Sequence, residues 1–236
     1  DMVFEFDLAN AIIGASGLGN KRNIVQQLNN VLNTYDPGEW ATFTSNHDLD
    51  RTLTQLQGDV DNNLIVANLL LTLPGAPFLY YGEEIGMVGN KVNGDEGVRT
   101  PMQWDGTPET GGFTTGTPWY PLNDGFEERT VAAQTDDPDS LLSRYRSLIH
   151  LRNSEQALQT GLTEIIDSTY KSAFAYLRYT EDETLLVLHN MDDRESREYV
   201  LMLEEGPLSD VSSVELIFST DGDTRMELPA LEVNEN

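Results

Sequence analysis

The chain has 236 residues, 39% of them hydrophobic and 8% aromatic, so it can bury a core and is not a disordered segment. Its 40 acidic residues against 14 basic ones give a net charge of −26, which disfavours binding to nucleic acid or to anionic membranes. Because cysteine is absent, disulfides, cysteine–zinc sites and thiol catalysis are excluded.

The acidic excess has two interpretations. Lysine supplies only three of the basic residues, and acid excess with scarce lysine is typical of halophile-like proteins that stay soluble in concentrated salt. The alternative is the ordinary acidic composition of a bacterial protein. Neither interpretation names a function.

The ends of the chain bear on its location. No stretch approaches the roughly 18 apolar residues of a membrane span, and the start at Asp1 lacks the basic region of a signal peptide. This favours the cytoplasm over secretion and leaves the compartment open. Since the chain begins in what reads as a strand, we expect residue 1 to be a cut made inside a longer protein.

The first 81 residues alternate strands with helices. Residues 2–8 predict a buried strand, and apolar residues at helical spacing predict a helix over 21–33. A strand over 40–44, a helix over 61–72 and a strand over 76–81 continue the pattern. Such alternation predicts a parallel α/β fold.

A change of pattern follows this alternation. Residues 86–138 form a long segment rich in Gly, Pro, Thr and Asp, whose aromatic residues argue for order, and a helix is expected over 140–153. Short strands separated by turn residues then predict a small antiparallel β domain. We expect those strands at 174–179, 184–189, 198–203 and 214–219, with domains of 1–157 and 158–236.

A polar cluster ends the strand at 40–44. Asn46, His47 and Asp48 place an amide, an imidazole and a carboxylate in three successive positions. A strand end is a rigid mount, and these groups suit the orientation of a ligand with many hydroxyls.

Four motifs in order resemble the α-amylase superfamily (glycoside hydrolase family 13). Residues 43–48 are similar to the segment after its seventh barrel strand, 75–86 to its eighth strand, and 140–152 to its last barrel helix. Residues 99–105, Arg-Thr-Pro-Met-Gln-Trp-Asp, resemble a loop of its α-glucosidase, oligo-1,6-glucosidase and trehalose-synthase branches. The tail resembles the β-sandwich that follows the barrel.

The resemblance implies a fold and also an absence. A (β/α)8 TIM barrel takes roughly 250 residues, but only about 155 precede the β domain here. We therefore expect an α/β fold made of barrel strands six to eight with their helices, followed by a small antiparallel β-sandwich. The family's nucleophilic aspartate follows strand four and its acid/base glutamate follows strand five, and neither signature is visible in this sequence.

The resemblance assigns two residues of the polar cluster. Asp48 resembles the family's transition-state-stabilising aspartate, and His47 would donate to the same sugar. The alternative is that Asp48 caps the next helix and His47 packs beneath it.

Three further residues are candidates for substrate binding. Arg51 would border the adjoining subsite, or form an ion pair at the surface or with Asp48. Arg99 resembles a subsite residue of the α-glucosidase branch, or anchors its loop to a barrel carboxylate. Trp104 would stack on a sugar face, unless it belongs to the core. The adjacent Glu83 and Glu84 point apart at a strand end, which favours a structural role.

These residues favour one function and leave alternatives. We expect the C-terminal part of a retaining glycosidase that hydrolyses α-glucosidic bonds in starch-derived oligosaccharides, with the isolated chain inactive. A glucosyl transferase or isomerase of the same family, and a non-catalytic carbohydrate-binding or assembly module, stay open. No metal site is visible; calcium is possible in the parent enzyme. Exposed barrel edges predict a homo-oligomer.

Overall fold

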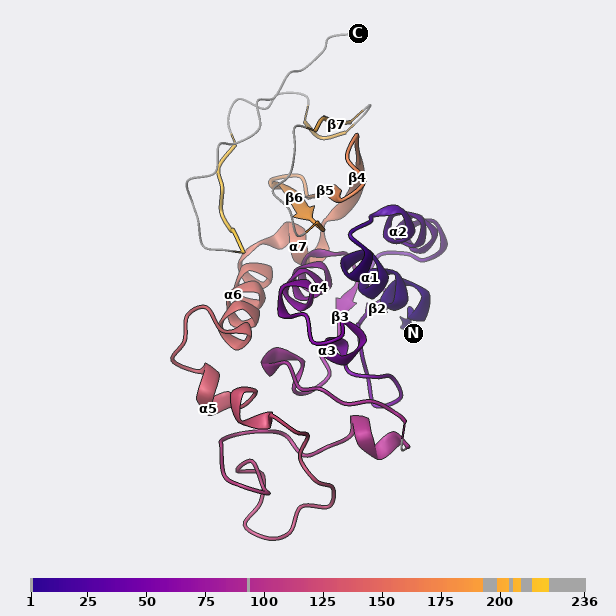
Figure 1. Ribbon diagram of the computed structural model, residues 1–236. Coiled ribbons are helices and arrows are strands. Elements are labelled where there is room, and N and C mark those ends of the chain that lie inside the picture. Colours follow the sequence, from indigo (N-terminus) through magenta and orange to yellow (C-terminus); the bar gives the residue numbers. More distant parts are fainter. Residues whose placement is uncertain (1, 93, 193–198, 204–205, 209–213, 221–236) are drawn as a thin grey trace.

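A computed structural model describes residues 2–92, 94–192, 199–203, 206–208 and 214–220 (Figure 1). The strands are β1 (Val3–Phe4), β2 (Trp40–Thr42), β3 (Ala76–Pro77), β4 (Leu162–Ser168), β5 (Ala173–Tyr179), β6 (Thr184–Asn190) and β7 (Leu201–Met202). The α-helices are α1 (Phe6–Leu18), α2 (Arg22–Thr34), α3 (Thr52–Gln55), α4 (Val60–Thr72), α5 (Val131–Gln134), α6 (Leu141–Ser154) and α7 (Gln156–Thr160). Three 3-10 helices lie between them, η1 (Glu83–Ile85), η2 (Asp95–Val98) and η3 (Phe126–Glu128).

The first sheet is parallel, with the strand order β1-β2-β3. Val3 pairs with Trp40, and Ala41 pairs with Ala76. Helices α1 and α2 connect β1 to β2, and α3 and α4 connect β2 to β3. The parallel strand–helix alternation predicted from the sequence is therefore confirmed.

Two predicted strands of this sheet are much shorter than expected. The strand expected over 2–8 ends at Phe4, because the helix α1 begins at Phe6. The strand expected over 76–81 ends at Pro77. Helix α1 was not predicted because both of its faces are apolar or small, so that no amphipathic stripe marks it. This helix is buried between neighbours, with Leu8, Ala9, Ala11, Ile12, Ala15 and Ser16 inaccessible.

Helices α2, α4 and α6 lie close to their predicted ranges, whereas the short helices α3, α5 and α7 were not predicted. Helix α2 buries Ile24, Leu28 and Val31 on one face, as the apolar spacing predicted. Helix α4 begins where the Asp59 carboxylate accepts a hydrogen bond from the Asn62 amide, and it ends at the Leu73-Pro74-Gly75 sequence. Gly75 has φ +95°, and a Cβ there would lie 2.3 Å from the Trp40 indole nitrogen. This glycine lets the chain turn against the buried Trp40.

The second sheet is antiparallel, with the order β6-β5-β4-β7. Strands β5 and β6 confirm the expected ranges to within one residue. Strand β4 was missed, and the strand expected over 198–203 is confined to Leu201–Met202, with Glu198 outside the described residues. Residues 214–219 are described and are not a strand, so that expectation was wrong.

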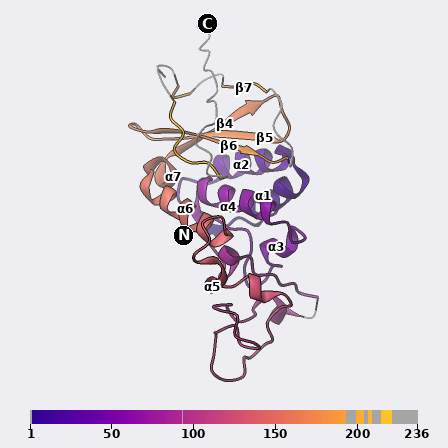
Figure 2. The same ribbon diagram turned by 60° about the vertical axis from the view of Figure 1, so that its left-hand side comes forward.

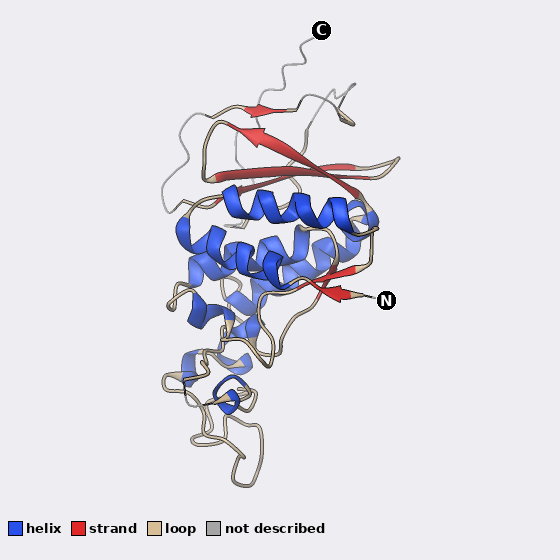
Figure 3. Ribbon diagram, turned by 90° about the vertical axis from the view of Figure 1, so that its right-hand side faces the viewer, coloured by secondary structure: helices blue, strands red, loops and turns tan. Residues whose placement is uncertain are grey.

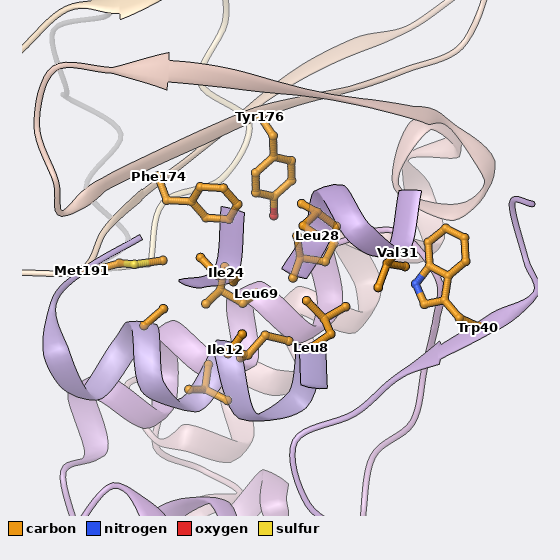
Figure 4. Packing of buried hydrophobic residues seen from close by; sticks show 14 of the residues in the cluster. Leu8, Ile12, Ile24, Leu28, Val31, Trp40, Leu69, Phe174, Tyr176 and Met191 are labelled. Carbon is orange, nitrogen blue, oxygen red and sulfur yellow. The ribbon is translucent and has the colours of Figure 1, made fainter. Parts of the chain in front are cut away.

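The antiparallel sheet covers the helix layer (Figure 3). Figure 4 shows Phe174 and Tyr176 reaching from β5 toward Leu28 of α2 and Leu69 of α4. Met191 closes the same core, which also contains Trp40 from the first sheet. One hydrophobic core thus joins the two sheets, and burial of each such large apolar side chain stabilises the fold by roughly 1.5–3 kcal/mol.

Two buried arginines also join the layers. The Arg152 guanidinium donates to the carbonyls of Leu71 and Leu73 at 2.8 and 3.1 Å, and Arg178 donates to the Thr72 carbonyl at 2.8 Å. These carbonyls end α4, where the helix dipole is negative and backbone acceptors lack partners within the helix. The two guanidinium groups therefore supply hydrogen-bond donors to the backbone carbonyls at the end of α4. The domain division at 157 and 158 stays a prediction.

The described part of the long segment over 86–138 contains η2, η3 and α5, and it extends away from the antiparallel sheet, beyond α3 (Figures 1 and 2). Its buried Gln103 donates to the carbonyl of Arg129 at 2.8 Å, and the Gln103 carbonyl accepts from the Val131 amide at 3.0 Å. Across the described residues, none of the helices has the length and apolar character needed to span a membrane.

Candidate active site

The polar cluster lies in a tight turn directly after β2. The Asn46 side-chain oxygen accepts a hydrogen bond from the Asp48 amide at 2.7 Å, and the Asn46 carbonyl accepts from the Leu49 amide at 3.4 Å. Asparagine favours such turns because its side chain mimics a backbone acceptor. Asn46 thus fixes the backbone that carries His47 and Asp48 into solvent.

A buried carboxylate anchors the base of this turn. Glu83 is 3% exposed and lies in η1, after β3. One of its oxygens accepts from the hydroxyls of Ser45 (2.5 Å), Thr52 (2.8 Å) and Thr44 (3.0 Å), and the other accepts from the Tyr80 amide (3.2 Å). Burial raises the pKa of Glu83, while these four donors act in the opposite direction. Glu83 is therefore structural, as expected.

Arg99 joins the segment after η2 to the turn. Its Nη2 lies 2.9 Å from the Asp48 Oδ1, and its Nε donates to the His47 carbonyl at 2.9 Å. The His47 Nε2 lies 3.2 Å from the other Asp48 oxygen. The side chains of His47, Asp48 and Arg99 are 64%, 55% and 37% exposed. The structure therefore brings three predicted site residues together at an accessible surface.

A second carboxylate holds the cations in place. Asp95 lies 2.9 Å from the Nη2 of Arg99 and 2.9 Å from the Nζ of Lys91, which donates in turn to the Asp48 carbonyl at 3.1 Å. The hydrogen bond from Lys91 lowers the pKa of Asp95. The carboxylates of Asp95 and Asp48 thus share the Arg99 guanidinium, while Lys91 links the Asp95 carboxylate to the backbone of the Asp48 turn.

Arg51 lies elsewhere than expected. Its side chain is 0% exposed, its guanidinium carbon is 4.8 and 4.7 Å from the ring centres of Tyr80 and Tyr81, and its Nη1 donates to the Tyr81 carbonyl at 2.6 Å. Burial lowers the pKa of this arginine. The expectation that Arg51 contacts substrate is contradicted, because a side chain enclosed by two tyrosines and the Gly89 loop presents no surface to a ligand.

Trp104 is accessible but separate from the other candidates. It is 51% exposed, and its backbone is held by hydrogen bonds with Gly111 and Ala132. Among the described contacts, none joins it to His47, Asp48 or Arg99. Its role as a platform for a sugar stays a prediction.

This arrangement suits recognition of a neutral, hydroxyl-rich ligand. An exposed carboxylate accepts hydrogen bonds from hydroxyls, while the imidazole and guanidinium donate them. No group of three or more His, Cys, Asp or Glu side chains within the described ranges is placed to hold a metal. Among the predicted site residues only Asp48 carries a carboxylate, whereas hydrolysis with retention needs two placed about 5–5.5 Å apart.

Comparison with known proteins identifies the family. The sequence profile of the family described as "Alpha amylase, catalytic domain" matches residues 1–161. The chain belongs to the α-amylase family. Its fold neighbours are α-amylase-family catalytic domains, which places the parallel sheet in the TIM-barrel class.

Relatives within the α-amylase family include amylases and glucosidases. The chain is 41% identical over 157 residues to the α-amylase SusG of Bacteroides thetaiotaomicron, covering 64% of this chain and 22% of that protein. It is 32% identical over 197 residues to an oligo-1,6-glucosidase of Heyndrickxia coagulans, covering 67% and 35%. The crystal structure of α-amylase from H.orenii has a TM-score of 0.72 and 36% identity, covering 82% and 40%. This chain thus spans about a fifth to two fifths of these proteins.

Lys91 and Asp95, which hold Arg99 in place, were not among the predicted site residues. Lys91, Asp95 and Arg99 are spaced four apart, which is the spacing of ion pairs on a helix. The segment reads as a loop, so this signal was not used. The short helix η2 begins at Asp95 and ends just before Arg99, so that it brings these two side chains within 2.9 Å of each other.

Proposed function

We propose that this α-amylase-family chain is the C-terminal part of a retaining α-glycosidase that hydrolyses α-glucosidic bonds in starch-derived oligosaccharides. The observation that carries the proposal is the exposed Asp48 carboxylate, held between Arg99 and His47 at the end of a parallel strand. Ligands of parallel α/β folds bind at the carboxyl ends of the strands.

In this proposal Asp48 stabilises the transition state. Its carboxylate accepts hydrogen bonds from ring hydroxyls, and these bonds tighten as the ring flattens toward an oxocarbenium-like state. Arg99 and His47 orient the carboxylate and donate to the same sugar. Trp104 offers a ring for a further sugar.

The finer fold assignment belongs to the same proposal. Strands β1, β2 and β3 correspond to barrel strands six, seven and eight, and the antiparallel sheet is part of a β-sandwich. The nucleophilic aspartate and the acid/base glutamate then come from strands that this chain does not contain. The isolated chain is accordingly inactive.

The test compares the 236-residue chain with the protein at the full length of its gene. Both are assayed on p-nitrophenyl α-glucoside, isomaltose, maltoheptaose and starch, with products separated by chromatography. We expect turnover from the full-length protein only. Free glucose or shorter glucans would identify a hydrolase, and new disaccharide linkages would identify a transferase or isomerase. A full-length protein that turns over none of these substrates would refute the enzymatic proposal and favour a binding module.

Partners and calcium complete the proposal. Strands β1 and β3 are the two edges of the parallel sheet, and the exposed rings of Phe4 on β1 and Phe78 after β3 have centroids 4.7 Å apart. These edges favour association of isolated chains, which light scattering measures as a mass above that of one chain. No binding to DNA or anionic vesicles is expected at this net charge. Calcium is proposed only for the full-length enzyme, and chelation followed by calcium restoration tests it.

A further inference from the structure

A cleft separate from the candidate active site is lined by Asn90, the residue before Lys91. It has a volume of about 500 Å³, within the range of pockets for small molecules. Among the described residues, three segments line it: residues 54–58 at the end of α3 and just after it, residues 88–90 together with Gly97, and residues 120–124. Neither His47, Asp48 nor Arg99 belongs to its lining.

Gly89 and Gly97 are among the residues that line this cleft. A Cβ on Gly97 would lie 2.2 Å from the Asn90 carbonyl oxygen, and one on Gly89 would lie 2.3 Å from the Gly97 carbonyl oxygen. The two backbone stretches therefore approach more closely than side chains allow.

Polar side chains with spare hydrogen-bonding capacity line the same cleft. Within the described contacts, the Gln57 amide and the Asp124 carboxylate have no partner. Asn123 uses its amide nitrogen to donate to the Val88 carbonyl at 2.6 Å, so its oxygen is left to accept. Asn90 uses its oxygen to accept from the Val92 amide at 3.1 Å, so its nitrogen is left to donate. Tyr120 adds a half-buried ring.

This lining selects a neutral ligand rich in hydroxyls. Amides and a carboxylate alternate donors with acceptors, as successive hydroxyls of a sugar require, and a tyrosine ring packs on the apolar face of a pyranose. Among the described residues that line the cleft there is no lysine, arginine or histidine, which disfavours phosphorylated or acidic sugars. One carboxylate is too few for the six to eight oxygens that calcium prefers.

We propose that this cleft is a second carbohydrate site, which binds a neutral glucan segment through Tyr120, Asn123 and Gln57. The inference rests on the proposed substrate class, because it names the same kind of chain at a separate place. Lys91 follows Asn90 and reaches the Asp48 turn, so one loop borders both sites. Glucan held at the cleft is thereby kept beside Asp48, and long glucans bind more tightly than short ones.

The test uses native gels that contain glycogen, with the full-length protein. Retarded migration of the wild type gives its affinity for the polymer. Tyr120→Ala is expected to weaken this affinity about tenfold, whereas Tyr120→Phe, which keeps the ring, leaves it nearly unchanged. Trp119→Ala is the matched control, because this neighbouring exposed tryptophan does not line the cleft. Thermal melting confirms that each variant is folded.

The outcomes separate this inference from the proposed activity. Support requires that Asp48→Asn stays retarded by glycogen and that Tyr120→Ala keeps wild-type turnover of p-nitrophenyl α-glucoside. If glycogen no longer retards Asp48→Asn but still retards Tyr120→Ala, the second site is overturned and the proposed activity stays intact. Calcium that binds the wild type but not Asp124→Asn, in a protein that glycogen does not retard, would also overturn it.

Discussion

The buried imidazole of His189 makes the stability of this protein depend on pH. His189 lies in β6, is 7% exposed, and its ring stacks against Phe174 and Tyr176. Burial lowers its pKa to about 4, from about 6.5 for an exposed imidazole. The surrounding core disfavours the charged form because it offers little solvation.

A hydrogen-bond chain fixes the neutral tautomer of His189. The Thr72 hydroxyl donates to the Asn68 carbonyl at 2.6 Å, so the Tyr176 hydroxyl, 2.6 Å away, donates to the Thr72 oxygen. Tyr176 then has no proton for His189, and its oxygen accepts from the His189 Nε2 at 3.2 Å. The imidazole therefore carries its proton on Nε2.

The magnitude follows from the two pKa values. Between pH 6.5 and about 4 the unfolded chain binds a proton at this position and the folded chain does not, so stability falls as the pH falls. The full difference is about 3 kcal/mol, of which about 2 kcal/mol is lost by pH 5. Above pH 6.5 the contribution is fully present.

Urea unfolding at pH 7.5 and pH 5 measures this loss. We expect the free energy of unfolding to fall by about 2 kcal/mol more in the wild type than in His189→Gln, whose amide nitrogen replaces Nε2 without a titratable group. His150→Gln is the matched control, since His150 is exposed on α6. An equal fall in the wild type and His189→Gln would refute the argument.

Three further predictions concern the site and the charge. Glu83→Gln turns an amide toward the Tyr80 amide and should cost about 1–3 kcal/mol in urea unfolding, whereas Glu84→Gln, at the adjacent position, should cost little; equal costs would contradict the anchoring role. Arg99→Ala should lower the turnover of the full-length protein at least about tenfold with little change in melting temperature, because exposed ion pairs stabilise little, and unchanged turnover would remove Arg99 from the site. If the surface is halophile-like, the melting temperature should rise when NaCl is increased from 0.05 to 1 M, because salt screens the repulsion within a net charge of −26. A lower melting temperature at 1 M NaCl would favour the ordinary acidic interpretation.

The sequence predicted the fold best where one face of an element is apolar. Helix α2 and strand β6 have clear periodicity, and both lie within two residues of their predicted ends. Helix α1 has Ala and Gly among its apolar residues and is packed on several sides, so neither helical nor strand periodicity was visible. Strand β4 alternates exposed with less exposed residues, and because it contains Glu164 and Asp167 it was not predicted as a strand.

The main residues of the candidate site could be predicted from the sequence, but the contacts that hold them in place could not. The motifs named His47, Asp48 and Arg99, and the structure places them in contact. Arg51 was misplaced because a sequence does not reveal that Tyr80 and Tyr81 enclose it. Asp95 was not predicted because it and its partners Lys91 and Arg99 lie in a segment whose composition indicates a loop.

The most direct test of the central claim is the turnover of the full-length Asp48→Asn variant. The side chain keeps its size and loses the charge that Arg99 and His47 hold, so kcat/KM on maltoheptaose should fall about a thousandfold. Asp61→Asn, an exposed aspartate in the first turn of α4, is the matched control and should retain wild-type turnover. Asp48→Asn activity within a few-fold of the wild type would contradict the role of Asp48 as transition-state stabiliser.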